Sequence, residues 1–135
     1  MAIPSAQEIR DFYSRYFETW NNHNREGFIQ NWRNLVNDVS AEDPVGTPLR
    51  KGFDQIVIGP WDLMNPTIRM YLEELIICGS EAAMVVRNEI TADDQVVVLR
   101  SIETMRYFED GSVLLRNWWE PQGEMLESFA SGDAN

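Results

Sequence analysis

The chain has 135 residues, 44% of them hydrophobic, and a formal net charge of −11 at pH 7. This length is typical of one domain with a substantial core. The negative charge argues against binding to nucleic acid or to anionic membranes, since both need a basic surface. No apolar run approaches the ~20 residues of a membrane-spanning helix, and the first residues lack the regions of a signal peptide, so we expect a cytoplasmic protein.

The single cysteine and the single histidine restrict the chemistry that the chain can carry. One cysteine excludes an internal disulfide and a cysteine-based metal cluster. We expect Cys78 to be an inert core residue and His23 to lie in a solvated turn. The sequence does not favour a Ser-His-Asp triad or a multi-histidine zinc site. Catalysis would therefore come from carboxylates, tyrosines and arginines, and we expect no cofactor and no metal.

The first half of the chain predicts three helices. The segment SAQE at 5–8 forms a capping box, and apolar residues then recur at helical spacing to about residue 21. A second helix is expected over roughly 25–36. The segment FDQIVIGPWDLM after Gly52 predicts a third, short helix interrupted at its glycine-proline pair.

From residue 67 onward the pattern changes to strand-like segments, separated by the turn signals CGSE, TADD and FEDGS. Four such segments in succession predict an antiparallel meander, and helices followed by a meander predict an α+β domain. We expect the helices to cover one face of a curved sheet. The domain is expected over residues 1–125, with 126–135 as a flexible tail.

Two carboxylates are candidates for chemistry. Residues two apart in a strand share a face, so Glu103 lies on the same side as Ser101 and Met105 and can face a partly apolar interior. A carboxylate is costly there unless it is paired, hydrogen-bonded or protonated. Asp43, directly before Pro44, is either a turn residue or a base. The alternative for Glu103 is an ion pair at the sheet edge.

Three segments resemble the ketosteroid isomerases, in the nuclear-transport-factor-like superfamily that also holds the SnoaL-type cyclases. IPSAQEIRDFYSRY is similar to the family's first helix, which supplies an active-site tyrosine. EDPVGTPLRKG resembles its base-bearing segment, and SIETMRYFEDG resembles the strand that carries its oxyanion-hole acid. The resemblance covers roughly residues 3–120. It implies a cone-shaped, curved antiparallel sheet with three N-terminal helices packed on it.

The resemblance also implies a catalytic set. Asp43 falls on the general base, Tyr16 on the tyrosine donor of the oxyanion hole, and Glu103 on the second donor. Asp43 would move a proton beside a ketone while Tyr16 and protonated Glu103 donate hydrogen bonds to the dienolate oxygen. The leading interpretation is therefore a steroid-Δ-isomerase-like enzyme that moves a double bond into conjugation in a small hydrophobic or polycyclic ketone.

The sequence departs from this family at several places, which include the oxyanion-hole acid, the tyrosines that support the active-site tyrosine, where Trp32 and Pro60 stand instead, and the last strand. Glu103 stands where the family has aspartate, which moves the carboxyl by about one methylene. Arg116, Trp118 and Glu120 share the strand face that should line the pocket, where steroid-binding members are mostly apolar, although Arg116 paired with Glu120 or Glu103 is the alternative. The expected substrate-binding residues are Trp61, Met84, Val86, Asn88, Arg116, Trp118 and Glu120.

Two other functions remain open, because this fold hosts many activities. One is a SnoaL-like cyclase or an epoxide-opening enzyme, in which Asp43 works with Glu73, Glu74 or Glu103. A further carboxylate pointing at Asp43 would favour this chemistry. A limonene-epoxide-hydrolase-like Asp-Arg-Asp set is matched at best by Arg87 and Glu89. The other function is a non-catalytic, ligand-binding dimer module.

The open face of the sheet is the expected partner surface. In such cones this face usually packs on a copy of itself, and the aromatic surplus of the chain supports a homodimer. Trp118, Trp119, Tyr107 and Val97 are the expected apolar contacts. We expect no nucleic-acid or membrane partner.

Overall fold

The computed structural model describes residues 2–120 of the chain. Helices α1 (Ala6–Asn21) and α2 (Arg25–Leu35) come first, followed by the short strands β1 (Asp38–Glu42) and β2 (Arg50–Lys51). A π-helical turn, η1 (Asp54–Ile58), continues into α3 (Gly59–Met64). The strands β3 (Ile68–Cys78), β4 (Glu81–Ala92), β5 (Gln95–Tyr107) and β6 (Ser112–Trp119) follow. The expected tail, residues 126–135, lies outside the described residues.

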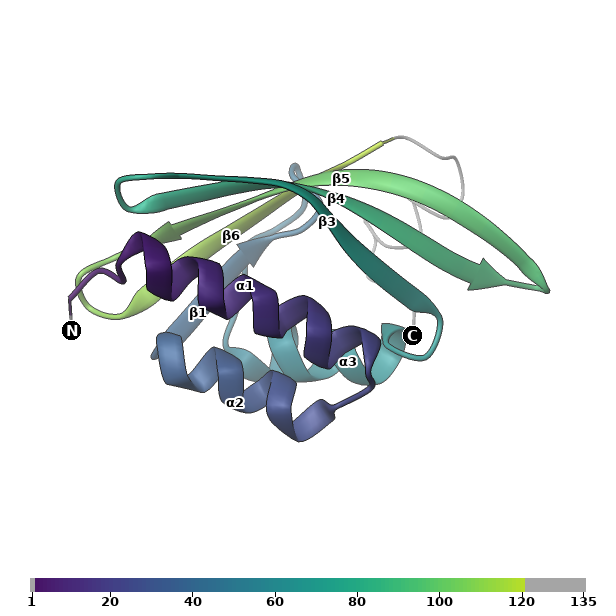
Figure 1. The fold of residues 1–135 in the computed structure, drawn as a ribbon, viewed down its shortest axis with the longest axis horizontal. Coiled ribbons are helices and arrows are strands. Elements are labelled where there is room, and N and C mark those ends of the chain that lie inside the picture. The colour runs from purple at the N-terminus through teal and green to yellow at the C-terminus, as the bar shows by residue number, and fades with distance from the viewer. Residues whose placement is uncertain (1, 121–135) are drawn as a thin grey trace.

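The three helices lie on one face of a curved sheet (Figure 1). Its strands follow the order β2-β1-β6-β5-β4-β3. The predicted α+β class and the antiparallel meander of β3 to β6 are confirmed. The sheet is mixed rather than wholly antiparallel, because β1 pairs parallel to β6. Glu42, the last residue of β1, lies opposite Arg116 of β6. Asp43, the next residue, therefore lies beside the last residues of β6.

Helix α1 begins with the predicted capping box. The Glu8 amide donates to Ser5 Oγ at 3.1 Å, and the Ser5 amide donates to Glu8 Oε1 at 3.0 Å. The apolar side chains of α1 then lie on one face, as its periodicity predicts. Within residues 2–120, no helix is long and apolar enough to cross a bilayer.

The third predicted helix contains a local widening at η1. The π-helical turn is followed by Gly59, where an added β-carbon would lie 2.9 Å from the Asp54 carbonyl oxygen. A larger residue would force that carbonyl to move, so glycine fits best at this position. Such π turns are frequent at functional sites. Here the turn brings Gln55, Ile56 and Val57 to the wall of a cavity.

The side chains of β5 alternate between the two faces of the sheet as predicted. Leu99, Ser101, Glu103 and Met105 are buried on the helix-facing side. The strand therefore carries a serine and a glutamate into a mainly apolar interior.

The predicted orientation of β6 is wrong. Asn117 lies opposite Glu103 in the β5–β6 register and shares its face, so Arg116 and Trp118 point to the outer side of the sheet. Glu120 follows β6 and is exposed, and its carboxylate accepts a hydrogen bond from the Arg100 amide. These three residues therefore do not line a pocket under the helices.

Several single-residue expectations are also corrected. Cys78 is exposed at the end of β3 and not in the core. Tyr107 and Val97 belong to the core or pack against it, so these two residues do not form an outer surface, whereas Trp119 lines the cavity under the helices and also borders a hollow beside Ile102 and Trp118. His23 lies in an exposed turn with φ of 57°, as predicted.

Candidate active site

A cavity of about 340 Å³ lies between the helices and the sheet. Most of its wall is apolar, and aromatic side chains of α1 and α2 form much of one side. A mainly apolar cavity with a few converging polar groups is the usual form of a small-molecule site. The polar or charged side chains on the wall, apart from those of the aromatic residues, are Asp43, Arg50, Gln55, Asn88, Ser101, Glu103 and Asn117.

The adjacent carboxylates Glu42 and Asp43 have different surroundings. Glu42 Oε1 accepts hydrogen bonds from Arg116 Nη2 at 3.1 Å and from the Gly46 amide at 3.2 Å. The Arg116 hydrogen bond lowers the pKa of Glu42, with help from the Gly46 amide. Asp43 instead lines the cavity, and its Oδ1 accepts from the Trp119 indole at 2.9 Å. Glu42 is therefore a surface ion pair, whereas Asp43 is available to a ligand.

The backbone after β1 holds Asp43 against β6. The Val45 amide donates to the Asn117 carbonyl at 2.8 Å, which fixes the turn beside the end of β6. Burial raises the pKa of Asp43, while hydrogen bonds from Trp119 and Asn117 and the charge of Arg50 oppose that rise. The donors around Asp43 favour its ionised form.

Glu103 lines the same cavity, but there burial is not opposed by hydrogen-bond donors. Burial raises its pKa to about 8, and the charge of Asp43 adds to the rise. Within residues 2–120, its carboxyl makes no hydrogen bond, so no donor offsets the cost of ionisation. Glu103 is therefore the group of the two that holds a proton more firmly, Asp43 is the one that ionises more readily, and the two groups titrate as a coupled pair.

Tyr16 adds a hydroxyl to this site. Its ring is held by an aromatic cluster, with the centroid of Phe28 at 4.9 Å and that of Trp32 at 6.2 Å. Burial, followed by the charges of Glu103 and Asp43, raises the pKa of Tyr16 well above its ordinary value. Its hydroxyl stays protonated and has no hydrogen-bond partner among residues 2–120, so it can donate to a ligand in the cavity.

Comparison with known proteins places the fold. No family model matches the chain. A structure of SalBIII, an epoxide hydrolase/cyclase-like enzyme described for pyran ring formation in the polyether salinomycin, is 16% identical with a TM-score of 0.69, over 84% of this chain and 92% of that one. A protein from Jannaschia sp. CCS1 assigned as a SnoaL-like polyketide cyclase is 14% identical with a TM-score of 0.67, over 93% of each chain.

An NTF2-like protein of unknown function from Cytophaga hutchinsonii ATCC 33406 also matches. It is 11% identical with a TM-score of 0.57, over 83% of this chain and 89% of that one. The protein has the NTF2-like fold. At these identities the matches establish the fold alone, so the activity of this chain has to be argued from its own side chains.

The fold brings together some of the predicted site residues. Asp43, Tyr16 and Glu103, which the sequence suggested as catalytic, line one cavity, and Val86 and Asn88 line it too. The structure thus puts both Asp43 and Glu103 on the cavity wall, while their catalytic roles stay predictions. Neither is confined to a surface turn or an edge ion pair.

The other predicted substrate-binding residues lie elsewhere. Met84 and Trp61 are buried in the core and are not on the cavity wall. Arg116, Trp118 and Glu120 lie outside, where the Arg116 guanidinium is paired with Glu42 and stacks 4.9 Å from the Trp118 ring. Their places on the wall are taken by residues that the sequence analysis did not select, chiefly Leu115, Asn117, Trp119, Trp32 and Arg50.

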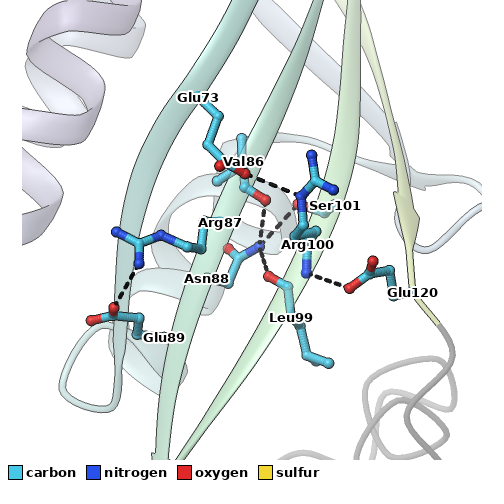
Figure 2. A network of polar contacts seen from close by, with 9 residues as sticks. All are labelled: Glu73, Val86, Arg87, Asn88, Glu89, Leu99, Arg100, Ser101 and Glu120. Atoms are coloured by element: carbon cyan, nitrogen blue, oxygen red, sulfur yellow. Dashed lines mark hydrogen bonds and ion pairs between the residues drawn. The ribbon is translucent and has the colours of Figure 1, made fainter.

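The other carboxylates considered as partners for Asp43 belong to the outer face of the sheet. Arg100 Nε pairs with Glu73 Oε1 at 3.1 Å, and Arg87 Nη1 pairs with Glu89 Oε2 at 3.3 Å (Figure 2). None of these four residues lines the cavity, nor does Glu74. Glu103 is therefore the second carboxylate of the site, and the Arg87 and Glu89 pair does not supply an Asp-Arg-Asp set.

Proposed function

We propose that this protein is an enzyme that opens an epoxide, or closes an oxygen-containing ring, by general acid/base catalysis. Asp43 is the base and Glu103 is the acid. One observation carries the proposal: two electrostatically coupled carboxyls share an apolar cavity, and only one of them is supplied with hydrogen-bond donors. The cyclase and epoxide hydrolase/cyclase-like names of two structural neighbours support the same class of reaction.

Each step of the proposed reaction uses a group on the cavity wall. Asp43 accepts the proton of a substrate hydroxyl while the hydroxyl oxygen forms a bond to one epoxide carbon. The C–O bond of that carbon to the epoxide oxygen breaks, and Glu103 gives its proton to the leaving oxygen. Tyr16 donates a hydrogen bond to the same oxygen. The reaction is an isomerisation without redox change, and proton exchange with solvent restores the pair.

Turnover of a γ,δ-epoxy alcohol tests this function. Intramolecular attack gives a cyclic ether of unchanged mass, whereas attack by water gives a triol that carries one added water. Mass spectrometry of the product formed in ¹⁸O-labelled water separates the two outcomes. Formation of either product above the buffer rate supports the proposed chemistry. A rate equal to that of buffer, measured over several ring sizes, would contradict it.

Double-bond isomerisation is the second candidate, and one observation favours it. Tyr16 and protonated Glu103 place two hydroxyl donors in the same cavity, as a dienolate oxygen requires. A β,γ-unsaturated 3-ketosteroid would report this activity as an increase in ultraviolet absorbance on conjugation. Activity on the ketosteroid without activity on the epoxide would select the isomerase. Binding of both without turnover would select a ligand-binding module.

We further propose that the outer face of the sheet forms a homodimer interface. Ile102 lies between Val85 and Trp118 in the strand register, and Ile102 and Trp118 are 49% and 38% exposed. Two pairs of charged neighbours on this face neutralise each other, Arg100 with Glu73 and Arg116 with Glu42, while Glu74 opposite Val85 makes no ion pair within residues 2–120. The face thus exposes apolar side chains beside two paired charges, which suits contact with a second copy.

Replacing Ile102 with glutamate is expected to convert a dimer into a monomer. The new carboxylates would meet their symmetry copies in the interface, where like charges without partners are unfavourable. Sedimentation should give twice the 15.6 kDa chain mass for the wild type and the single mass for the variant. Leu49→Glu, at an exposed apolar residue of the loop before β2, should remain dimeric. A monomeric wild type would remove the proposed interface.

A further inference from the structure

A second polar cluster lies on the cavity wall, apart from the reacting carboxyls. Asn88 of β4 and Ser101 of β5 are 1% and 4% exposed, and both line the cavity. Asn88 Nδ2 donates to the Leu99 carbonyl at 3.1 Å and to Ser101 Oγ at 3.0 Å (Figure 2). The mechanism proposed above gives neither residue a role.

The hydrogen bonds of Asn88 fix the orientation of its amide. The Leu99 oxygen is a carbonyl and only accepts, so the atom beside it is the amide nitrogen. The nitrogen is occupied by the strand and by Ser101. Within residues 2–120, Oδ1 of Asn88 accepts no hydrogen bond. The amide therefore keeps one unused acceptor at a residue of the cavity wall.

Ser101 complements this acceptor with a donor. Its Oγ accepts from Asn88, and its own proton goes to no partner in the described part of the chain. The two side chains together offer one acceptor and one donor at neighbouring points. A hydroxyl is the simple neutral group that donates one hydrogen bond and accepts another. A hydrocarbon at this place would leave both protein groups unpaired, which is unfavourable.

The position of the cluster sets its distance from the reacting end. Ser101 and Glu103 lie on the same face of β5 two residues apart, which corresponds to roughly 7 Å along the strand. Asn88 lies opposite Leu99, two residue pairs beyond Ser101 and so further from Glu103. The cluster therefore lies along the same wall, beyond the acid, at a distance comparable to the length of two fused six-membered rings.

We infer that Asn88 and Ser101 form a second substrate subsite, which binds a hydroxyl group at the end of the substrate remote from its reacting oxygen. This inference rests on the proposed function only in taking Tyr16 and Glu103 as the reacting end. It narrows the substrate to an oxygenated molecule with at least two oxygen functions. A hydrocarbon skeleton with a single ketone or epoxide would leave the subsite unused.

Two naphthols test the subsite by isothermal titration calorimetry. 2-Naphthol offers one hydroxyl, which Tyr16 and Glu103 can bind, and 2,6-dihydroxynaphthalene adds a second hydroxyl at the far end of the same rings. The wild type should bind the diol about tenfold more tightly, as expected for one added pair of hydrogen bonds. In Asn88→Leu this preference should fall to the small statistical advantage of two equivalent hydroxyls. The affinity for 2-naphthol should stay the same.

Ser101→Ala keeps the test decisive if Asn88→Leu does not fold. It removes only the donor and should reduce the preference for the diol in part. Gln55→Leu, which removes another polar side chain from the wall, should keep the full preference. Equal affinity of the wild type for the two naphthols, or an unchanged preference in both variants, would overturn the subsite. Binding of 2-naphthol that is insensitive to Tyr16→Phe would instead contradict the proposed active site, and the subsite with it.

Discussion

The Asp43→Asn variant is expected to lose about 10²–10⁴-fold in kcat/KM, which is the usual contribution of a positioned general base. The amide has nearly the shape of the carboxylate, and its oxygen can still accept from the Trp119 indole, which bonds Oδ1 at 2.9 Å. The variant should therefore fold normally while it lacks the basic oxygen that takes the substrate proton. Initial rates on the γ,δ-epoxy alcohol and on the ketosteroid measure the loss for both candidate reactions.

The neighbouring carboxylate provides the matched control. Glu42 precedes Asp43 directly, but it is bound to Arg116 on the outside of the sheet. Glu42→Gln removes the same charge from nearly the same place and should change the rate by about twofold or less, since an exposed ion pair contributes little. Equal losses of rate in Asp43→Asn and Glu42→Gln would mean that catalysis depends on the local negative charge and not on a general base. A wild-type rate in Asp43→Asn would remove Asp43 from the mechanism.

The sequence predicts the layers of this fold well, because the signals are local. The capping box of α1, the broad apolar stripe after it and the turn signals between the long strands each act within a few residues. The alternation of Ser101, Glu103 and Met105 also indicates one common face, although it leaves open whether the glutamate lies inside or pairs at the sheet edge. These features identify an α+β domain with helices on one face of its sheet before any distance is known.

The orientation of β6 could not be obtained in the same way. Two adjacent tryptophans, Trp118 and Trp119, cannot both face inward, and nothing in the segment itself selects between them. The register across the tight turn decides the question, since Tyr107 opposite Val113 places Glu103 opposite Asn117. The Trp119 indole then donates to Asp43 on the cavity side of the sheet. Counting pairs outward from the turn FEDGS was the signal that would have found Asn117 and Trp119.

The roles of the adjacent Glu42 and Asp43 depend on an interaction that is distant in sequence. They separate only because β1 runs parallel to β6, which brings Arg116 beside Glu42 and leaves Asp43 past the end of the strand. No local pattern predicts that the first and last strands along the chain will pair in parallel within the sheet. The carboxylate before Pro44 could therefore be selected by resemblance alone, and its surroundings had to come from the structure.

The activity should fall as the pH rises through about 8, because Glu103 must hold a proton to act as the acid. Burial and the charge of Asp43 give this carboxyl a pKa of about 8, whereas Asp43 must be ionised at the same pH. The pH–rate profile should therefore be bell-shaped, and its two apparent pKa values should describe Asp43 and Glu103 together as a coupled pair. Glu103→Gln should lower the rate by about 10²-fold or more and abolish the alkaline limb of the residual activity.

The same group predicts how stability depends on pH. The pKa of Glu103 is about 8 in the folded chain and near its ordinary 4.5 in the unfolded chain. Between these values the folded state holds a proton that the unfolded state has lost. The free energy of unfolding should therefore fall as the pH rises, with a contribution from Glu103 of about 1.4 kcal/mol per pH unit.

Urea unfolding at several pH values between 5 and 8 isolates this contribution when the wild type is compared with Glu103→Gln. The glutamine has no proton to lose, so the free energy of unfolding of the variant should lack the pH dependence that Glu103 contributes. The variant should therefore become more stable relative to the wild type as the pH rises. Glu74→Gln, at an exposed carboxylate of β3, should keep the wild-type slope. If the free energy of unfolding depended on pH in the same way for the wild type and for Glu103→Gln, Glu103 would be ionised in the folded protein. The site would then hold two bases and no acid.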